Sequence, residues 1–237
     1  MTSSKRLDGR GFEETREIEA KIGIVKRADG SAMFRMGKTV AYAAVYGPRD
    51  LYPKFLQNPE KGIMRCNYNM MPFSGQGERV RPGPSRRSRE IGMVTEKALS
   101  SVVNLDEFKN AVVDVFIEFP QTDAGSRCTG ICAAALALAD AGITMKDLVA
   151  AVAVGKVGDR LAVDLSYEEE ALKDPDTTDI PMAFVPSTGE IVLLQMDGII
   201  SKDELMEAIE LGKNACKKLN EIQVAALKKK FEVDKNE

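Results

Sequence analysis

The stretch from Ala111 to Gly142 reads AVVDVFIEFPQTDAGSRCTGICAAALALADAG, and the prediction of the fold starts from it. Residues 111–119 alternate apolar with polar side chains, which predicts a half-buried strand. Residues 126–141 are rich in alanine and leucine and are followed by Gly142, which predicts a helix that ends at this glycine. The loop Asp123-Ala-Gly-Ser-Arg127 joins the two. The stretch is therefore predicted to be a strand, a tight turn and a helix.

Elements of the same two kinds are predicted on both sides of this stretch. Strands and one helix precede it, and strands and a long helix that opens with the capping box Ser201-Lys-Asp-Glu204 follow it. This order indicates an α+β fold and suggests a duplicated unit, and no linker is long enough to separate two independent domains. The further predicted strands are 17–25, 32–36, 39–46, 67–73, 148–154, 161–165, 180–185 and 191–196, and the further helices start near Arg87 and at Ser201.

The composition narrows the range of possible functions. Of the 237 residues, 33 are basic and 36 acidic, so the formal net charge is -3 and any site for a polyanion must be a local patch. The chain has no histidine, which excludes Ser-His-Asp and Cys-His triads, histidine-containing zinc motifs and histidine proton shuttles. An enzyme of this composition must use carboxylates, arginines, lysines, backbone amides or a metal held by oxygen atoms.

The cysteines and the apolar segments indicate the compartment. The four cysteines form no CxxC pair, and Cys128 and Cys132 lie one helical turn apart in an alanine-rich helix, where they suit a packed core. Residues 1–16 are polar and charged, unlike a signal peptide. No apolar run approaches the roughly 18 residues that a membrane span needs. We therefore expect a reduced, soluble, cytoplasmic protein without a membrane partner.

Five arginines are concentrated in residues 79–89 of this acidic chain. Guanidinium groups match phosphate oxygens bidentately and stay charged at any working pH. Such a run is more often a solvated surface. This run has no lysine, however, and Arg86 and Arg87 lie where a loop of glycine and proline enters a helix, which favours a role in phosphate binding. The five are Arg79, Arg81, Arg86, Arg87 and Arg89.

The loop from Asp123 to Arg127 is a second candidate for an anion site. The free amides of a first helical turn, a glycine that allows close approach, a serine hydroxyl and an arginine together suit an oxyanion. The alternative interpretation is an ordinary turn between strand and helix, with Ser126 as the N-cap. The loop by itself does not distinguish the two.

The segment from Asp164 to Asp179 is acidic and contains a single lysine, Lys173. Paired carboxylates bind divalent metals or transfer protons, although an acidic segment alone is more often a solvated loop. Two cationic phosphate sites beside carboxylates, with no histidine and no obvious nucleophile, favour chemistry between two phosphates. The carboxylates are Asp164, Glu168, Glu169, Glu170, Asp174, Asp176 and Asp179.

Seven motifs spread over nearly the whole chain resemble the RNase PH family, and within it the catalytic RNase PH-type subunits of the archaeal exosome. The resemblance implies the α+β RNase PH fold (ribosomal protein S5 domain 2-like), with two βαβα halves packed as one compact unit. The halves would be residues 1–142, with the arginine pair and the phosphate loop, and 143–237, with the acidic loop and the last helix. The motifs are KRLDGR (5–10), YGP (46–48), NMMPFS (69–74), RRSREI (86–91), DAGSR (123–127), ALADAG (137–142) and DL (164–165).

The same resemblance implies an activity and the residues that carry it. The activity is phosphate-dependent 3′→5′ degradation of single-stranded RNA to nucleoside diphosphates, and its reverse is RNA tailing. Inorganic phosphate is the implied co-substrate and Mg²⁺ the expected cofactor. The implied phosphate-binding residues are Gly125, Ser126 and Arg127, the RNA-binding residues are Arg65, Tyr68, Arg86 and Arg87, and the catalytic residues are Arg87, Asp179 and Glu170. Asp179 and Glu170 are also the possible metal ligands, and Asp174 and Asp176 are alternatives to Glu170.

The implied assembly is an alternating hexameric ring with a homologous, non-catalytic RNase PH-type subunit, carrying RNA-binding cap subunits. Two alternatives stay open. One is a free, homohexameric RNase PH that trims tRNA 3′ ends. The other is a non-catalytic ring subunit that only binds RNA, against which the arginine pair and Asp179 speak.

Overall fold

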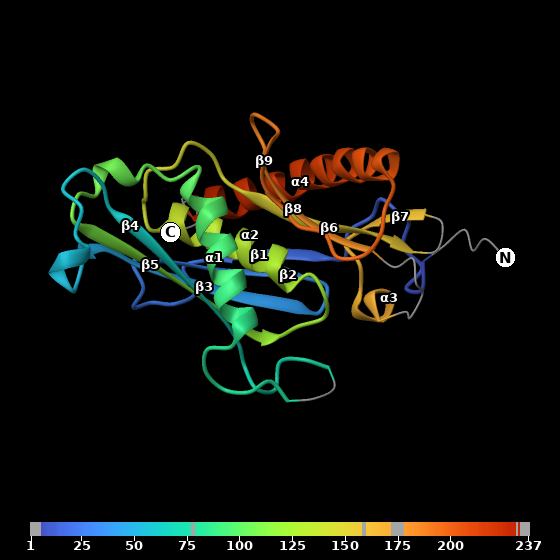
Figure 1. The fold of residues 1–237 in the computed structure, drawn as a ribbon, viewed down its shortest axis with the longest axis horizontal. Coiled ribbons are helices and arrows are strands. Elements are labelled where there is room, and N and C mark those ends of the chain that lie inside the picture. The colour runs from blue at the N-terminus through green and yellow to red at the C-terminus, as the bar shows by residue number, and fades with distance from the viewer. Residues whose placement is uncertain (1–5, 77–78, 158–159, 172–177, 231, 233–237) are drawn as a thin grey trace.

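The computed structural model describes residues 6–76, 79–157, 160–171, 178–230 and 232, and its strands form two sheets (Figure 1). The first sheet has the strand order β1-β2-β3-β5-β4. Strands β4 and β5 pair in parallel and the other neighbours are antiparallel. The strands are β1 (Ile18–Ile22), β2 (Gly30–Met36), β3 (Thr39–Asp50), β4 (Ile63–Met70) and β5 (Ala111–Gln121).

The second sheet is antiparallel, with the order β7-β6-β8-β9. With helices packed on both sheets, the predicted α+β class is confirmed. The division at residue 142 stays a prediction. The strands are β6 (Ala150–Val157), β7 (Arg160–Val163), β8 (Thr178–Val185) and β9 (Glu190–Leu194).

Helix α2 (Ser126–Asp140) lies at the centre of the molecule and confirms the predicted core helix. It packs against β2 and β3 of the first sheet and β6 of the second. Nearly every side chain from Ser126 to Leu138 is buried, as expected for a helix that is apolar all round. Its run of alanines lets both sheets approach closely, and Cys128 and Cys132 are buried free thiols within it, as predicted.

Two longer helices cover this core. Helix α1 (Arg86–Ser100) starts at a capping box of Ser85 and Ser88 and packs against β4. Helix α4 (Lys202–Lys230) packs against β6 and β1. In the part of the chain that the model describes, no helix is both long and apolar enough to cross a membrane. The short helices are η1 (Lys54–Leu56), η2 (Leu105–Glu107) and α3 (Tyr167–Glu170).

Two elements differ from the sequence-based expectation. The strand predicted over 67–73 is displaced toward the N-terminus, because β4 covers Ile63–Met70 and a turn follows. The segment predicted as an acidic loop contains the helix α3, which has a capping box between Ser166 and Glu169. The S-x-x-E pattern of a capping box was present in the sequence, but so short a helix has no apolar periodicity.

Arginines of the N-terminal segment connect the two sheets. Arg16 donates from Nη2 to Oδ1 of Asp164 at 2.7 Å, and Asp164 directly follows β7 of the second sheet. Arg6 binds the carboxylate of Glu169 from Nε at 2.8 Å and from Nη2 at 2.5 Å. All four side chains are buried. Although burial opposes it, hydrogen bonding to Asp164 raises the pKa of Arg16 above its usual value.

We expect Asp164→Asn to destabilise the protein strongly. Asparagine tolerates the left-handed backbone at this position, where φ is 56°, so the change mainly removes the charge that pairs with Arg16. Removing one partner of a buried ion pair costs about 3–5 kcal/mol, and the remaining contact of Arg16 with Asp123 at 3.5 Å places the expected loss at the lower end of this range. Urea unfolding of the purified chain measures the loss.

The matched control is Lys21→Met, which breaks the exposed ion pair of Lys21 with Glu19. Such pairs contribute less than about 1 kcal/mol. A loss for Asp164→Asn as small as the loss for Lys21→Met would contradict the structural role of the Arg16–Asp164 pair.

Candidate functional site

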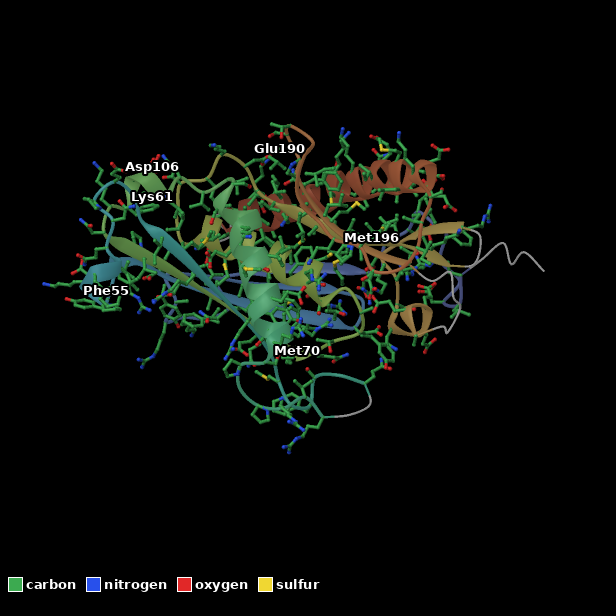
Figure 2. The ribbon with its side chains drawn as sticks, in the orientation of Figure 1. Phe55, Lys61, Met70, Asp106, Glu190 and Met196 are labelled. Atoms are coloured by element: carbon green, nitrogen blue, oxygen red, sulfur yellow. The ribbon has the colours of Figure 1, made fainter. Side chains whose placement is uncertain are left out.

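A cavity of about 810 Å³ opens between the two halves of the chain. Figure 2 labels Met70, at the end of β4, and Met196, just after β9; both line the cavity, one from each half. Six of the predicted site residues, from α1, the loop before α2, α2, α3 and β8, also line it. They are Arg87, Gly125, Ser126, Arg127, Glu170 and Asp179.

The phosphate loop forms one wall of the cavity. Ala124 and Gly125 both have left-handed backbone, with φ of 57° and 62°, and they turn the chain directly into α2. The N–H of Thr129 makes an early helical bond to the Gly125 carbonyl, so the amides of the preceding turn have no acceptor within the helix. A Cβ on Gly125 would lie 3.2 Å from Nη2 of Arg16, which leaves little room for another side chain.

Two arginines supply positive charge beside these amides. Arg127 lines the cavity with its Nε buried and without a hydrogen-bond partner among the described residues. Its Nη2 lies 3.8 Å from Oε1 of Glu90, also in the wall. Arg87, on the first turn of α1, lines the cavity and is exposed. The wall therefore combines free amides, one partly unpaired guanidinium and one exposed guanidinium, which suits phosphate oxygens.

Two of the four predicted RNA-binding residues lie outside the cavity lining but are exposed. Arg86 precedes Arg87 on α1. Arg65 extends from β4 and makes a bidentate pair with Asp114, at 2.6 and 2.9 Å. Their contact with RNA stays a prediction.

The structure leaves the ring of Tyr68, which was predicted to bind RNA, no face on which a base could stack. The side chain is 5% exposed and its ring packs against Phe119, so no open ring face remains for a nucleobase. Its hydroxyl instead donates to Oγ of Ser126 at 2.8 Å. The hydrogen bond from Tyr68 therefore helps to fix the position of Ser126 at the end of the phosphate loop. The period of β4 turns residue 68 toward the helices, and residues 65, 67 and 69 toward the opposite face.

Two carboxylates line the cavity close to the phosphate loop. Burial, opposed by Arg127 and Arg87 and assisted by the charge of Asp197, raises the pKa of Asp179 to about 6. Burial also raises the pKa of Glu170 to about 7, and the charge of Asp179 contributes, while Arg16 and a hydrogen bond from the Gly125 amide oppose it. The two acids therefore form a coupled pair that holds a proton near neutral pH.

The acidic pair has the donor atoms that Mg²⁺ prefers. Oδ1 of Asp179 is buried and has no hydrogen-bond partner among the described residues. Within those residues no three histidine, cysteine, aspartate or glutamate side chains are grouped to hold a metal by themselves. Mg²⁺ commonly binds through one or two carboxylates and completes its shell with substrate phosphates and water, so Asp179 and Glu170 fit such an ion.

Several cavity residues were missed by sequence reasoning. Asp197 pairs backbone to backbone with Asp179, Glu90 and Gln195 bond to each other at 3.4 Å, and Tyr167 lines the wall beside Glu170. Nothing in their local patterns separates them from surface residues, because only the packing of the two halves brings them to the cavity. Asp174 and Asp176, the alternatives to Glu170, lie outside the described residues.

We expect Glu170→Gln to stabilise the chain at alkaline pH. The raised pKa means that the folded state binds this proton more tightly than the unfolded state, so the wild-type protein loses stability as the pH rises from about 4.5 through about 7. Glutamine removes the buried charge. The variant should exceed the wild type by about 1–3 kcal/mol near pH 8 and match it near pH 4 in metal-free urea titrations. A difference that does not vary with pH would contradict the assigned pKa.

Comparison with known proteins agrees with this geometry. The chain is 48% identical to "Exosome complex component Rrp41" of Thermococcus kodakarensis over 240 residues, covering 99% of this chain and 95% of that protein. It is 46% identical to the protein of the same name from Methanopyrus kandleri, covering 95% of this chain and 93% of the relative.

The fold has solved counterparts. An Archaeoglobus fulgidus exosome chain, from a structure described as having RNA bound to the active site, matches with a TM-score of 0.76 at 25% identity, over 96% of this chain and 93% of the other. Rice Rrp46 matches with a TM-score of 0.82 at 25% identity, over 94% and 100%. The models of the 3′ exoribonuclease family match residues 14–144 (domain 1) and 147–215 (domain 2). The chain therefore belongs to the 3′ exoribonuclease family of RNase PH type.

Proposed function

We propose that this chain is the catalytic RNase PH-type subunit of an archaeal exosome, a 3′→5′ exoribonuclease that uses inorganic phosphate and releases nucleoside diphosphates. The observation that carries the proposal is the cavity, in which a free helix N-terminus and two arginines face a pair of carboxylates. The relatives named as exosome components, at 46–48% identity over nearly the whole chain, support it.

Phosphate binding is assigned to the first turn of α2. Inorganic phosphate would accept hydrogen bonds from the amides of Ser126 and Arg127 and from the Arg127 guanidinium, with Gly125 allowing its close approach. Arg87, beside the loop, would bind the terminal phosphodiester of the RNA. The two anions repel each other strongly in a partly buried cavity, and fixed positive groups on both sides offset this repulsion and stabilise the charge of the transition state.

The reaction needs no covalent intermediate. A phosphate oxygen forms a bond to the terminal phosphorus, the bond from that phosphorus to the 3′ oxygen of the preceding nucleotide breaks, and a nucleoside diphosphate leaves. The 3′ oxygen takes up a proton, which we assign to the pair of Asp179 and Glu170. A carboxyl group that keeps its proton near neutral pH can serve as this general acid.

Mg²⁺ is part of the proposal, with Asp179 and Glu170 as its ligands. When bound there, it would neutralise phosphate charge and polarise the bond that breaks. The protein residues contribute independently of it: Arg127 and the amides orient the phosphate, and Arg87 holds the RNA end.

The proposed partners are single-stranded RNA, a homologous non-catalytic ring subunit that alternates with this chain in a hexamer, and RNA-binding cap subunits, in the cytoplasm. The names of the relatives and of the solved exosome support this assembly. They favour it over a free RNase PH that trims tRNA. The acidic pair and the arginines in the cavity favour a catalytic subunit over one that only binds RNA.

We expect RNA degradation to require inorganic phosphate. The complex of this chain with its ring partner, incubated with poly(A), should release ADP with phosphate present and be inactive in phosphate-free buffer. Excess ADP should drive the reverse reaction and extend RNA. Release of AMP at an unchanged rate without phosphate would contradict the proposal, since it would show that water attacks.

We expect Asp179→Asn to abolish turnover while RNA binding stays equal or becomes tighter. Asparagine removes the proton donor and metal ligand, and it also removes a negative charge that repels the RNA phosphates. Turnover and binding are measured on the same complex by gel assay and fluorescence anisotropy.

Asp106→Asn serves as the control, because Asp106 lies in η2, far from Met70 and Met196 (Figure 2). It should change neither quantity. Preserved turnover with weakened binding in Asp179→Asn would show that Asp179 holds RNA and takes no part in catalysis.

A further inference from the structure

The residues described so far provide groups that bind phosphates. The terminal nucleotide of an RNA also carries a base, and a surface that contacts this base has yet to be identified. Tyr68, which was predicted to bind RNA, is buried and donates its hydroxyl to Ser126. Tyr167 is the only aromatic residue among the described residues that line the cavity. Its side chain is 41% exposed, so part of the ring is open to a ligand.

The helix α3 places Tyr167 beside the acidic pair. Tyr167 and Glu170 are three residues apart on α3, hence on the same face of the helix, and both line the cavity. Glu170 in turn accepts a hydrogen bond from the Gly125 amide of the phosphate loop. The ring of Tyr167 therefore lies about one helical turn from Glu170, which contacts the proposed phosphate site.

The backbone of Tyr167 is firmly fixed although α3 is short. Ser166 and Glu169 form a reciprocal capping box around it. The Glu169 carboxylate is buried and held by Arg6, and the Tyr167 amide donates to Oδ1 of Asp123 at 3.4 Å. A ring on a fixed backbone loses little conformational entropy when it binds a flat partner.

The ring itself has no aromatic or cationic neighbour in the described part of the chain. Tyr68 packs on Phe119, Tyr46 on Phe116, and Arg160 covers Phe12, whereas Tyr167 has no comparable contact among the described residues. A tyrosine with an open face in a substrate cavity is the arrangement that stacks a nucleobase.

We propose that Tyr167 stacks on the base of the 3′-terminal nucleotide while its phosphate is held near the loop at Gly125. The inference rests on the proposed function. Stacking does not distinguish one base from another, because every base has an aromatic face. Stacking on Tyr167 would therefore bind the terminal nucleotide of any RNA sequence, as a processive enzyme requires.

The test compares wild type, Tyr167→Phe and Tyr167→Leu in the assembled complex, by shortening of a 5′-labelled RNA. Leucine keeps the volume but removes the aromatic face, and we expect kcat/KM for RNA to fall by about 5- to 100-fold. Phenylalanine should keep the wild-type value, and KM for phosphate should not change in either variant. Phe55→Leu is the matched control, because Phe55 is 84% exposed and lies far from Met70 and Met196 (Figure 2).

A second RNA, identical but lacking its 3′-terminal base, identifies the contact. The wild type should lose the same factor on this RNA, and Tyr167→Leu should lose nothing further, since the partner of the ring is already absent. Equal activity of Tyr167→Leu and wild type, or losses that multiply, would overturn the proposal. If the wild type does not shorten the intact RNA with phosphate, the proposed function fails instead.

Discussion

The buried ion pair between Arg16 and Asp164 is the interaction on which the rest of the structure depends. Arg16 comes from the segment before the first sheet, and Asp164 follows a strand of the second sheet. Arg16 also donates to the main-chain carbonyl of Asp123, which begins the phosphate loop. One guanidinium therefore joins both halves and supports the loop between them. Its charge is compensated by an aspartate within the same buried network, as a charge without bulk water requires.

The Arg16–Asp164 pair positions two parts of the site, the phosphate loop and the helix α3. On one side, the loop enters α2 with left-handed backbone at Ala124 and Gly125, so that free amides and Arg127 face the cavity. On the other side, the chain after Asp164 forms α3, which brings Glu170 to the Gly125 amide. Anion donors and a carboxyl group with a raised pKa thus lie close together in the cavity, as the proposed transfer between two phosphates requires.

Local patterns in the sequence were sufficient for most of the regular elements. Alternation predicted β5 and the alanine-rich run predicted α2, whereas the loop between them fitted an anion site and an ordinary turn equally well. The prediction failed where a role depended on which way a side chain faces. Tyr68, predicted to bind RNA, is buried because it lies on the helix-covered face of a strand. Tyr167, which the sequence analysis did not single out, is exposed on a helix too short to show periodicity.

The sequence by itself determined which kinds of group are available for chemistry. The absence of histidine, the arginine run and the acidic segment restrict the site to phosphates, guanidinium groups and carboxylates. Only the tertiary structure decided which acids meet and in which protonation state. Glu170 and Asp179 come together because α3 and β8 converge on the phosphate loop. Their raised pKa values come from burial between two halves, and burial is a property of packing that no local pattern encodes.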